Sequence, residues 1–238
     1  MSRVSIVVIA AVAVALGAPA ARASGASLIY LSWHAPYGEP GATRDIGVAC
    51  GDTTREDTLF FTCDVGTDSP SFNGMTATVL VHSEVPDTLG PHWQFGRGMS
   101  RLRNIRALWD GDSALRVRTP WGGLPGTGAI HYDYTRGIGT LRMIFAVPAG
   151  QSPPVRFGDR LVLARLLVRR PPAGAGCDQP ICIEWARATF ALTEGYEPTV
   201  ASGDRFVTWN SRAGGGCAEF RRPLGPRPWK PPPGPGSR

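Results

Sequence analysis

Charged side chains are scarce in this 238-residue chain: Asp, Glu, Lys and Arg make up 18% of it, against 42% for the apolar set. A chain with this many apolar and this few charged residues is not wholly disordered. The 30 glycines and 22 prolines exclude a helical bundle or coiled coil, because both residue types interrupt long helices. The length suits one large domain or two small ones, and a sizeable core can form.

Long apolar runs are also absent, apart from one near the start. Residues 4–16 are apolar, follow Arg3 and lead to the small residues Ala21 and Ala23. This order is typical of a secretory signal peptide, and the run is shorter than the ~20 residues of a membrane-spanning helix. We expect a signal peptide at 1–23 and a mature chain that is secreted, extracellular or held in the cell envelope, without stable membrane insertion. An uncleaved N-terminal anchor is the alternative.

Excess positive charge is missing from the body of the chain, although the formal net charge is +6. Arg3 and Arg22 lie in the expected signal peptide, and residues 212–238 hold six Arg or Lys residues against Glu219. The stretch 24–211 is therefore close to neutral, and we expect no nucleic-acid partner. Residues 212–238 are too rich in Pro and Gly to pack, so we expect a basic disordered tail after a single domain at 24–211.

Known catalytic motifs are absent as well. The chain has no Gly-x-Ser-x-Gly elbow, no His-Glu-x-x-His and no Walker-type loop, and its four histidines stand singly. We therefore expect no metal and no cofactor, and we favour a protein without catalytic activity. The alternative is a glycosidase, which needs two facing acids; Asp110, Asp112 and Asp133 are the candidates.

Five cysteines in an exported chain are candidates for disulfides. Cys177 and Cys182 enclose a short loop that contains a proline, so we expect them to pair. We expect a second bridge between Cys50 and Cys217, with Cys63 left as a buried thiol. Other pairings of the five remain open.

Short β-runs separated by turn residues dominate the pattern. In residues 72–82, for example, Met75, Ala77, Val79 and Val81 share one face. Further runs cover residues 28–33, 45–50, 58–65, 129–134, 140–147, 160–170, 181–192 and 205–209. We expect an all-β fold: a two-sheet antiparallel β-sandwich of the immunoglobulin or jelly-roll kind, with a closed barrel as the lesser option. At most one short helix is expected, at residues 99–109, where apolar residues recur at helical spacing.

Aromatic residues in loop-like segments are the candidate ligand contacts, because flat rings can stack against sugar rings. The expected ligand-binding residues are Trp33, Tyr37, Trp121, Tyr132, Asp133 and Tyr134. The alternative for these tryptophans is ordinary packing in the core or at its rim.

The strand order resembles that of bacterial cohesin modules and related carbohydrate-binding β-sandwiches. The resemblance is carried by Ile46-Gly-Val-Ala-Cys-Gly-Asp52, by Asn73-Gly-Met-Thr-Ala-Thr-Val-Leu-Val81, and by the Gly158-Asp159 turn before a long strand. It covers roughly residues 44–210, while residues 90–128 and the cysteines depart from it.

These features together indicate a secreted, non-catalytic binding or adhesion module of cohesin-like type, with an extracellular protein or glycan as its ligand. The alternative is a secreted protein that binds or hydrolyses glycans through loop aromatics and acids. A purely structural envelope component is a third possibility.

Overall fold

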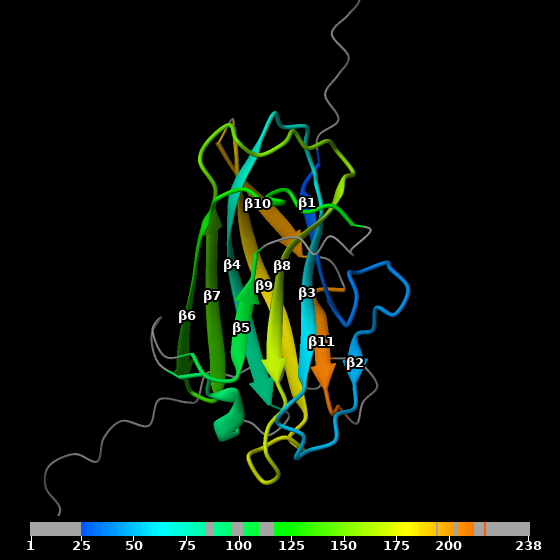
Figure 1. Cartoon of the computed structure of the whole chain (residues 1–238), viewed down its shortest axis with the longest axis vertical. Helices are drawn as coiled ribbons and strands as arrows, with labels where there is room; N and C mark the ends of the chain where they lie inside the picture. The colour runs from blue at the N-terminus through cyan, green and yellow to red at the C-terminus, as the bar shows by residue number, and fades with distance from the viewer. Residues whose placement is uncertain are drawn as a thin grey trace, which may run out of the picture.

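The computed structural model describes residues 25–83, 88–96, 102–109, 117–193, 195–201, 204–211 and 217. Within this part, the chain is almost entirely β (Figure 1). The strands are β1 (Ser27–Trp33), β2 (Asp45–Ile46), β3 (Glu56–Asp64), β4 (Phe72–Ser83), β5 (Ile105–Leu108), β6 (Thr127–Thr135), β7 (Ile138–Ala146), β8 (Arg160–Arg169), β9 (Ile181–Leu192), β10 (Gly195–Ala201) and β11 (Phe206–Trp209). A single 3-10 turn, η1, spans Pro91–Trp93.

The strands form two stacked sheets, as expected from the sequence. The first sheet has the antiparallel order β5-β8-β3-β1 and lies in front in Figure 1. The second sheet has the order β6-β7-β4-β9, and both β10 and β11 then pair along the free side of β9. A short parallel pairing of β1 with β10 joins the two sheets at one edge, and β2 extends β11. The expected two-sheet sandwich is confirmed.

Alternation along the strands builds the core between the sheets. In β4, Met75, Ala77, Val79 and Val81 are buried, whereas the residues between them point outward. Aromatic rings join the layers, because Trp185 of β9 meets Phe61 of β3 edge to face at 5.1 Å between ring centres. Burial of such rings is the main source of stability for a sandwich of this kind.

A two-residue turn joins β6 to β7 in the second sheet. Thr135 and Ile138 are the last paired residues, and both Arg136 and Gly137 between them have positive φ. Two positive φ values are the signature of the turn type whose twist matches paired strands. This turn joins the β-runs expected at residues 129–134 and 140–147 into one hairpin.

The prediction of a helix at residues 99–109 was wrong for the described residues of this range. Residues 105–108 form the strand β5 and pair antiparallel with residues 165–168 of β8; residues 97–101 lie outside the described residues. The apolar residues do recur at helical spacing, but Ile105 and Arg106 also alternate between buried and exposed. The open edge of β8 favours the strand, because it satisfies backbone groups that a short helix would leave unpaired.

Two disulfides brace the sandwich, and their pairing differs from the expected one. Cys50 is bonded to Cys177, and Cys182 to Cys217, each with a Cα–Cα distance of 5.7 Å. The expected bridges Cys177–Cys182 and Cys50–Cys217 are therefore wrong. The expectation that Cys63 is a buried free thiol is confirmed, and burial raises its pKa.

Strand geometry explains the correction. Cys182 lies in β9 between Ile181 and Ile183, which point into the core, so that Cys182 points outward to Cys217. Cys177 precedes the strand and is held toward the opposite side. Its carbonyl accepts hydrogen bonds from the Trp209 indole at 3.1 Å and the Asn210 amide at 2.7 Å.

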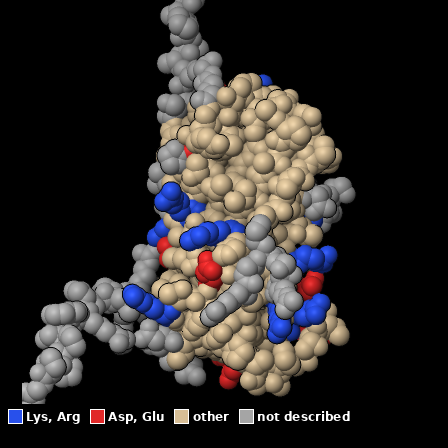
Figure 2. Space-filling view, turned by 90° about the vertical axis from the view of Figure 1, so that its left-hand side faces the viewer, with Lys and Arg blue, Asp and Glu red and all other residues tan. Residues whose placement is uncertain are grey.

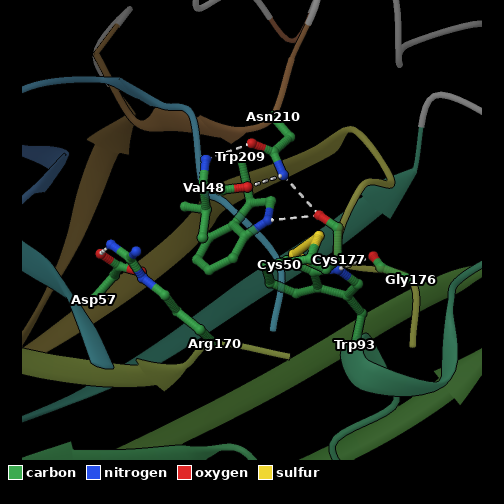
Figure 3. The surroundings of a disulfide bond; sticks show 9 residues. All are labelled: Val48, Cys50, Asp57, Trp93, Arg170, Gly176, Cys177, Trp209 and Asn210. Atoms are coloured by element: carbon green, nitrogen blue, oxygen red, sulfur yellow. Dashed lines mark hydrogen bonds and ion pairs between the residues drawn. A yellow bond between two sulfur atoms is a disulfide. The ribbon is translucent and has the colours of Figure 1, made fainter. Parts of the chain in front are cut away.

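The surroundings of the Cys50–Cys177 bridge form a rigid corner (Figure 3). Asn210 bonds the backbone of Val48 in both directions, at 2.6 and 3.2 Å, and so ties the β2–β3 loop to the end of β11. Nearby, the buried carboxylate of Asp57 receives two hydrogen bonds of 2.8 Å from Arg170. This corner joins the loops after β2 and β8 without any helix.

The expected signal peptide and nearly all of the expected tail lie outside the described residues. Cys217 is the exception, because its disulfide fastens that position of the expected tail to β9. In the described part of the chain, no helix has the length and hydropathy needed to cross a bilayer.

Candidate functional site

The outer surface of strands β6, β7, β4 and β9 is the candidate binding surface, and we call it the β6–β9 face. It lies on the side of the second sheet turned away from the core. Strand pairing arranges its side chains in rows across the sheet. The members are Ala129, His131 and Asp133 of β6; Thr140, Arg142 and Ile144 of β7; Thr76, Thr78 and Leu80 of β4; and Glu184, Arg187 and Thr189 of β9.

An apolar side chain lies in the first row of this face. Ile144 is 52% exposed, and its strand neighbours are Ala129 on one side and Thr76 on the other. Small or β-branched neighbours leave the isoleucine accessible rather than covering it.

The second row is basic. Arg142 and Arg187 flank Thr78, one from each side, and both are exposed. Since neighbouring strands lie about 4.8 Å apart, these two arginines stand on strands roughly 10 Å apart. Neither guanidinium has an ion-pair partner among the described residues, so both remain available to an acidic partner.

Acidic side chains on this face are already paired. The Asp133 carboxylate lies 3.2 Å from Nδ1 of His131 on the same strand. Glu184 lies 3.1 Å from Arg205 and 3.7 Å from His82, and its side chain is only 12% exposed. The charge that the face offers to a partner is therefore mainly that of its arginines.

The distribution of charge on the neighbouring side of the molecule is uneven. Figure 2 looks onto the β6 side and shows Arg, Lys, Asp and Glu gathered in its lower half, whereas the upper half is nearly free of them. The upper half includes the first residues of β6, which runs downward in Figure 1. On this side of the molecule, charged and uncharged regions are thus segregated rather than mixed.

Three of the expected ligand contacts are buried in the core, so the prediction was wrong for them. Trp33 is 0% exposed, and Trp121 and Tyr132 are 1% exposed. Each ring is tolerated there because its polar atom donates a hydrogen bond to a backbone carbonyl. The acceptors are Thr208 at 3.1 Å, Leu163 at 2.9 Å and Trp93 at 2.9 Å, in that order.

The other three expected contacts are spread over different places. Asp133 lies on the β6–β9 face, while Tyr134 beside it is partly buried against the core. Tyr37 lies on the opposite side of the sandwich, where its ring stacks on Tyr30 of β1 at 4.3 Å between centres. The structure therefore does not bring the six expected residues together in one site. Asp110 and Asp112 lie outside the described residues.

Tyr37 belongs to a polar cluster of its own. Its hydroxyl donates a hydrogen bond of 2.5 Å to Asp204, which also pairs with Arg44. This hydrogen bond, followed by burial, raises the pKa of the Tyr37 phenol. The cluster borders a pocket of about 580 Å³ beside the loop of residues 34–44.

The described residues contain no group of three or more His, Cys, Asp or Glu side chains arranged to hold a metal ion. The four bonded cysteines serve as disulfides, and Cys63 is enclosed in the core.

Comparisons with known proteins give matches only among solved structures; no family model and no curated protein matches the chain. The second type II cohesin module of the ScaA scaffoldin of Acetivibrio cellulolyticus has a TM-score of 0.41 and 10% identity, over 78% of this chain and 97% of that module. A type II cohesin domain from the cellulosome of the same organism gives 0.38 and 9%, over 78% and 96%. A structure described as a type II cohesin–X-dockerin complex from that organism gives 0.37 and 11%, over 78% and 99%.

These matches are cohesin modules, the class whose strand order the sequence resembles. All three TM-scores lie below 0.5, so the fold described above rests on this chain's own strands and pairings, and no function follows from the matches.

Sequence reasoning missed the residues that make the β6–β9 face, although a signal for them existed. The outward positions of β4, namely Thr76, Thr78 and Leu80, follow directly from the alternation in residues 72–82. The same alternation in β7 marks Arg142 and Ile144 as outward. The pattern could not show that no other described segment covers this surface.

Proposed function

We propose that this chain is an exported, non-catalytic binding module that docks an extracellular protein on the β6–β9 face. One observation carries the proposal: a sheet surface on which the half-exposed Ile144 adjoins Arg142 and Arg187, two exposed arginines without an ion-pair partner among the described residues. Apolar contact next to unpaired cations is the kind of surface that yields both affinity and orientation in protein–protein docking.

The surface chemistry favours a protein over a glycan at this face. None of its described members is aromatic, and stacking on a flat ring is the main way in which proteins hold sugars without large cavities. A protein partner would present an apolar side chain to Ile144 and carboxylates to Arg142 and Arg187. Such a partner surface is amphipathic and acidic.

A glycosidase at this face finds no support in its carboxylates. Asp133 and Glu184 are its acids, and the register places two strands, β7 and β4, between them. Three strand spacings separate them by roughly 14 Å, whereas paired glycosidase acids stand about 5–9.5 Å apart. A binding role therefore fits the face better than hydrolysis of a glycan.

Export is proposed on the signal-peptide pattern of residues 1–23 and on the two disulfides, which persist in oxidising compartments. Secretion of the mature chain can be checked by N-terminal sequencing, which should start at Ser24.

The docking proposal can be tested with the variant Ile144→Asp. The purified wild-type protein is immobilised, extracellular proteins of the source organism are passed over it, and any retained protein is produced pure and titrated. We expect a saturable partner whose affinity falls at least about tenfold for Ile144→Asp, because the variant replaces apolar contact by a desolvated charge.

Phe157→Asp is a matched control. Phe157 is 51% exposed, close to the value for Ile144, but it lies in the loop before β8. It should bind as the wild type does. An equal loss in both variants, or no loss in Ile144→Asp, would contradict docking on the β6–β9 face.

A further inference from the structure

A second site lies on the other side of the sandwich, in the pocket beside Tyr37. Its walls come from the loop of residues 34–44, the end of β1, the start of β8 and the segment before β11. The lining residues are Ser32, Tyr37, Gly38, Glu39, Ala42, Thr43, Arg44, Arg160 and Asp204. The volume of about 580 Å³ is within the range of small-molecule sites, about 300–1,000 Å³.

Arg160 and Tyr37 of this pocket are held in place by hydrogen bonds and ring contacts. Arg160 donates two hydrogen bonds of 2.7 Å to Asp64, which also accepts one of 2.9 Å from the Tyr30 hydroxyl. The guanidinium carbon of Arg160 lies 5.4 Å from the ring centre of Tyr37. A site built from such fixed groups loses little conformational freedom when a ligand binds.

The charges of the lining cancel. Arg44 and Arg160 stand against Glu39 and Asp204, so the pocket carries no net charge that would select an anion or a cation. Each arginine is already paired with a carboxylate, which further lowers its attraction for an anionic ligand. Donors and acceptors nevertheless converge there, next to an aromatic ring. Hydroxyl groups, which donate and accept at once, match such a lining.

A variant of Glu39 can distinguish a binding role of the pocket from a purely structural one. The Glu39 carboxylate has no hydrogen-bond or ion-pair partner among the described residues, unlike that of Asp204, whose contacts with Tyr37 and Arg44 fasten the loop. The Glu39 side chain is therefore dispensable for the cluster that holds residues 34–44, and Glu39 is one of the residues that line the pocket.

We propose that the Tyr37 pocket binds a neutral sugar residue, through Glu39 and Asp204 as hydroxyl acceptors and Arg44 and Arg160 as donors. This site is separate from the β6–β9 face, so the module has two ligands: a protein on one side of the sandwich and a neutral glycan on the other. The proposed sugar site does not depend on the proposal that a protein docks on the β6–β9 face.

The test is calorimetric titration of the purified mature protein with neutral xylo-, cello-, malto- and manno-oligosaccharides. Oligogalacturonate provides an anionic arm and an arginine-containing hexapeptide a cationic arm. We expect saturable binding of at least one neutral oligosaccharide, and binding of both charged probes at least about tenfold weaker. Glu39→Gln should weaken sugar binding about tenfold or more, because it removes a charged hydrogen-bond acceptor, while leaving the thermal midpoint unchanged.

Glu56→Gln is the matched control, since Glu56 is partly exposed, pairs with Arg106 and does not line the pocket. It should bind sugar as the wild type does. Three results would overturn the proposal: no binding of any neutral oligosaccharide, tighter binding of a charged probe, or unchanged sugar binding in Glu39→Gln. A Glu39→Gln protein that also lost thermal stability would assign the residue to the loop clamp and contradict the binding role.

Discussion

Removing the two disulfides separately should lower the free energy of unfolding by different amounts. The Cys50–Cys177 bridge closes a sequence separation of 127 residues, and Cys182–Cys217 one of 35. Loop-closure entropy then assigns about 5 kcal/mol to the first bridge and about 4 kcal/mol to the second at 25 °C. The two loops do not overlap in sequence, so the contributions should add.

Urea unfolding followed by tryptophan fluorescence measures these costs. The double variant C50A/C177A should be less stable than C182A/C217A by about 1 kcal/mol, and each should unfold at a urea concentration lower than the wild type by roughly 2 M. A domain of typical stability, about 5–15 kcal/mol, would hardly survive the loss of both bridges.

Thiol counting in denaturant gives the sharper discrimination. C182A/C217A should show one free thiol per molecule, that of Cys63, because the Cys50–Cys177 bridge remains. If Cys177 were instead bonded to Cys182 and Cys50 to Cys217, the same variant would show three. Three thiols, or a larger loss of stability in C182A/C217A than in C50A/C177A, would refute this pairing.

Three further perturbations follow from the packing. Asp57→Ala should cost about 3–5 kcal/mol in urea unfolding, because the partly buried Arg170 would lose the carboxylate that neutralises it. Gly128→Ala should cost about 1–3 kcal/mol by the same assay, since the added Cβ would lie 2.2 Å from the Trp109 indole nitrogen; an unchanged midpoint would show that the indole moves freely. Burial and a hydrogen bond to Asp64 raise the pKa of Tyr30 to about 12, so its contribution to stability should be intact below pH 10 and be lost as the pH rises from 10 to 12. Phenolate absorbance during alkaline titration checks this, and ionisation of all tyrosines near pH 10 would contradict it.

Strand identity was largely predictable, because alternation is a local signal. The run from Phe72 to Ser83 shows this best: its inward and outward residues are those that the period of two predicts. The β5 strand was not predictable, since Ile105–Leu108 fits both periods and only the open edge of β8 decides between them. The β10 strand, Gly195–Ala201, begins at a glycine and contains a proline, which hid it from the pattern.

Contacts between segments that lie far apart in the chain could not be predicted from the sequence. Cysteine pairing depends on which side of β9 the Cys182 side chain leaves, and hence on the register of the sheets. The aromatic residues taken as ligand contacts illustrate the same limit: Trp33 and Trp121 look loop-like in sequence, yet backbone carbonyls of remote strands accept their indole protons in the core. The grouping of Tyr37 with Arg160 and Asp204 likewise requires the fold.

The most direct measurement is the affinity of a purified extracellular partner for the wild type, Ile144→Asp and Phe157→Asp. Docking on the β6–β9 face predicts that Kd rises at least about tenfold for Ile144→Asp and keeps the wild-type value for Phe157→Asp. Equal affinity of all three proteins, with the fold of each intact by circular dichroism, would contradict the assignment of this face as the binding surface.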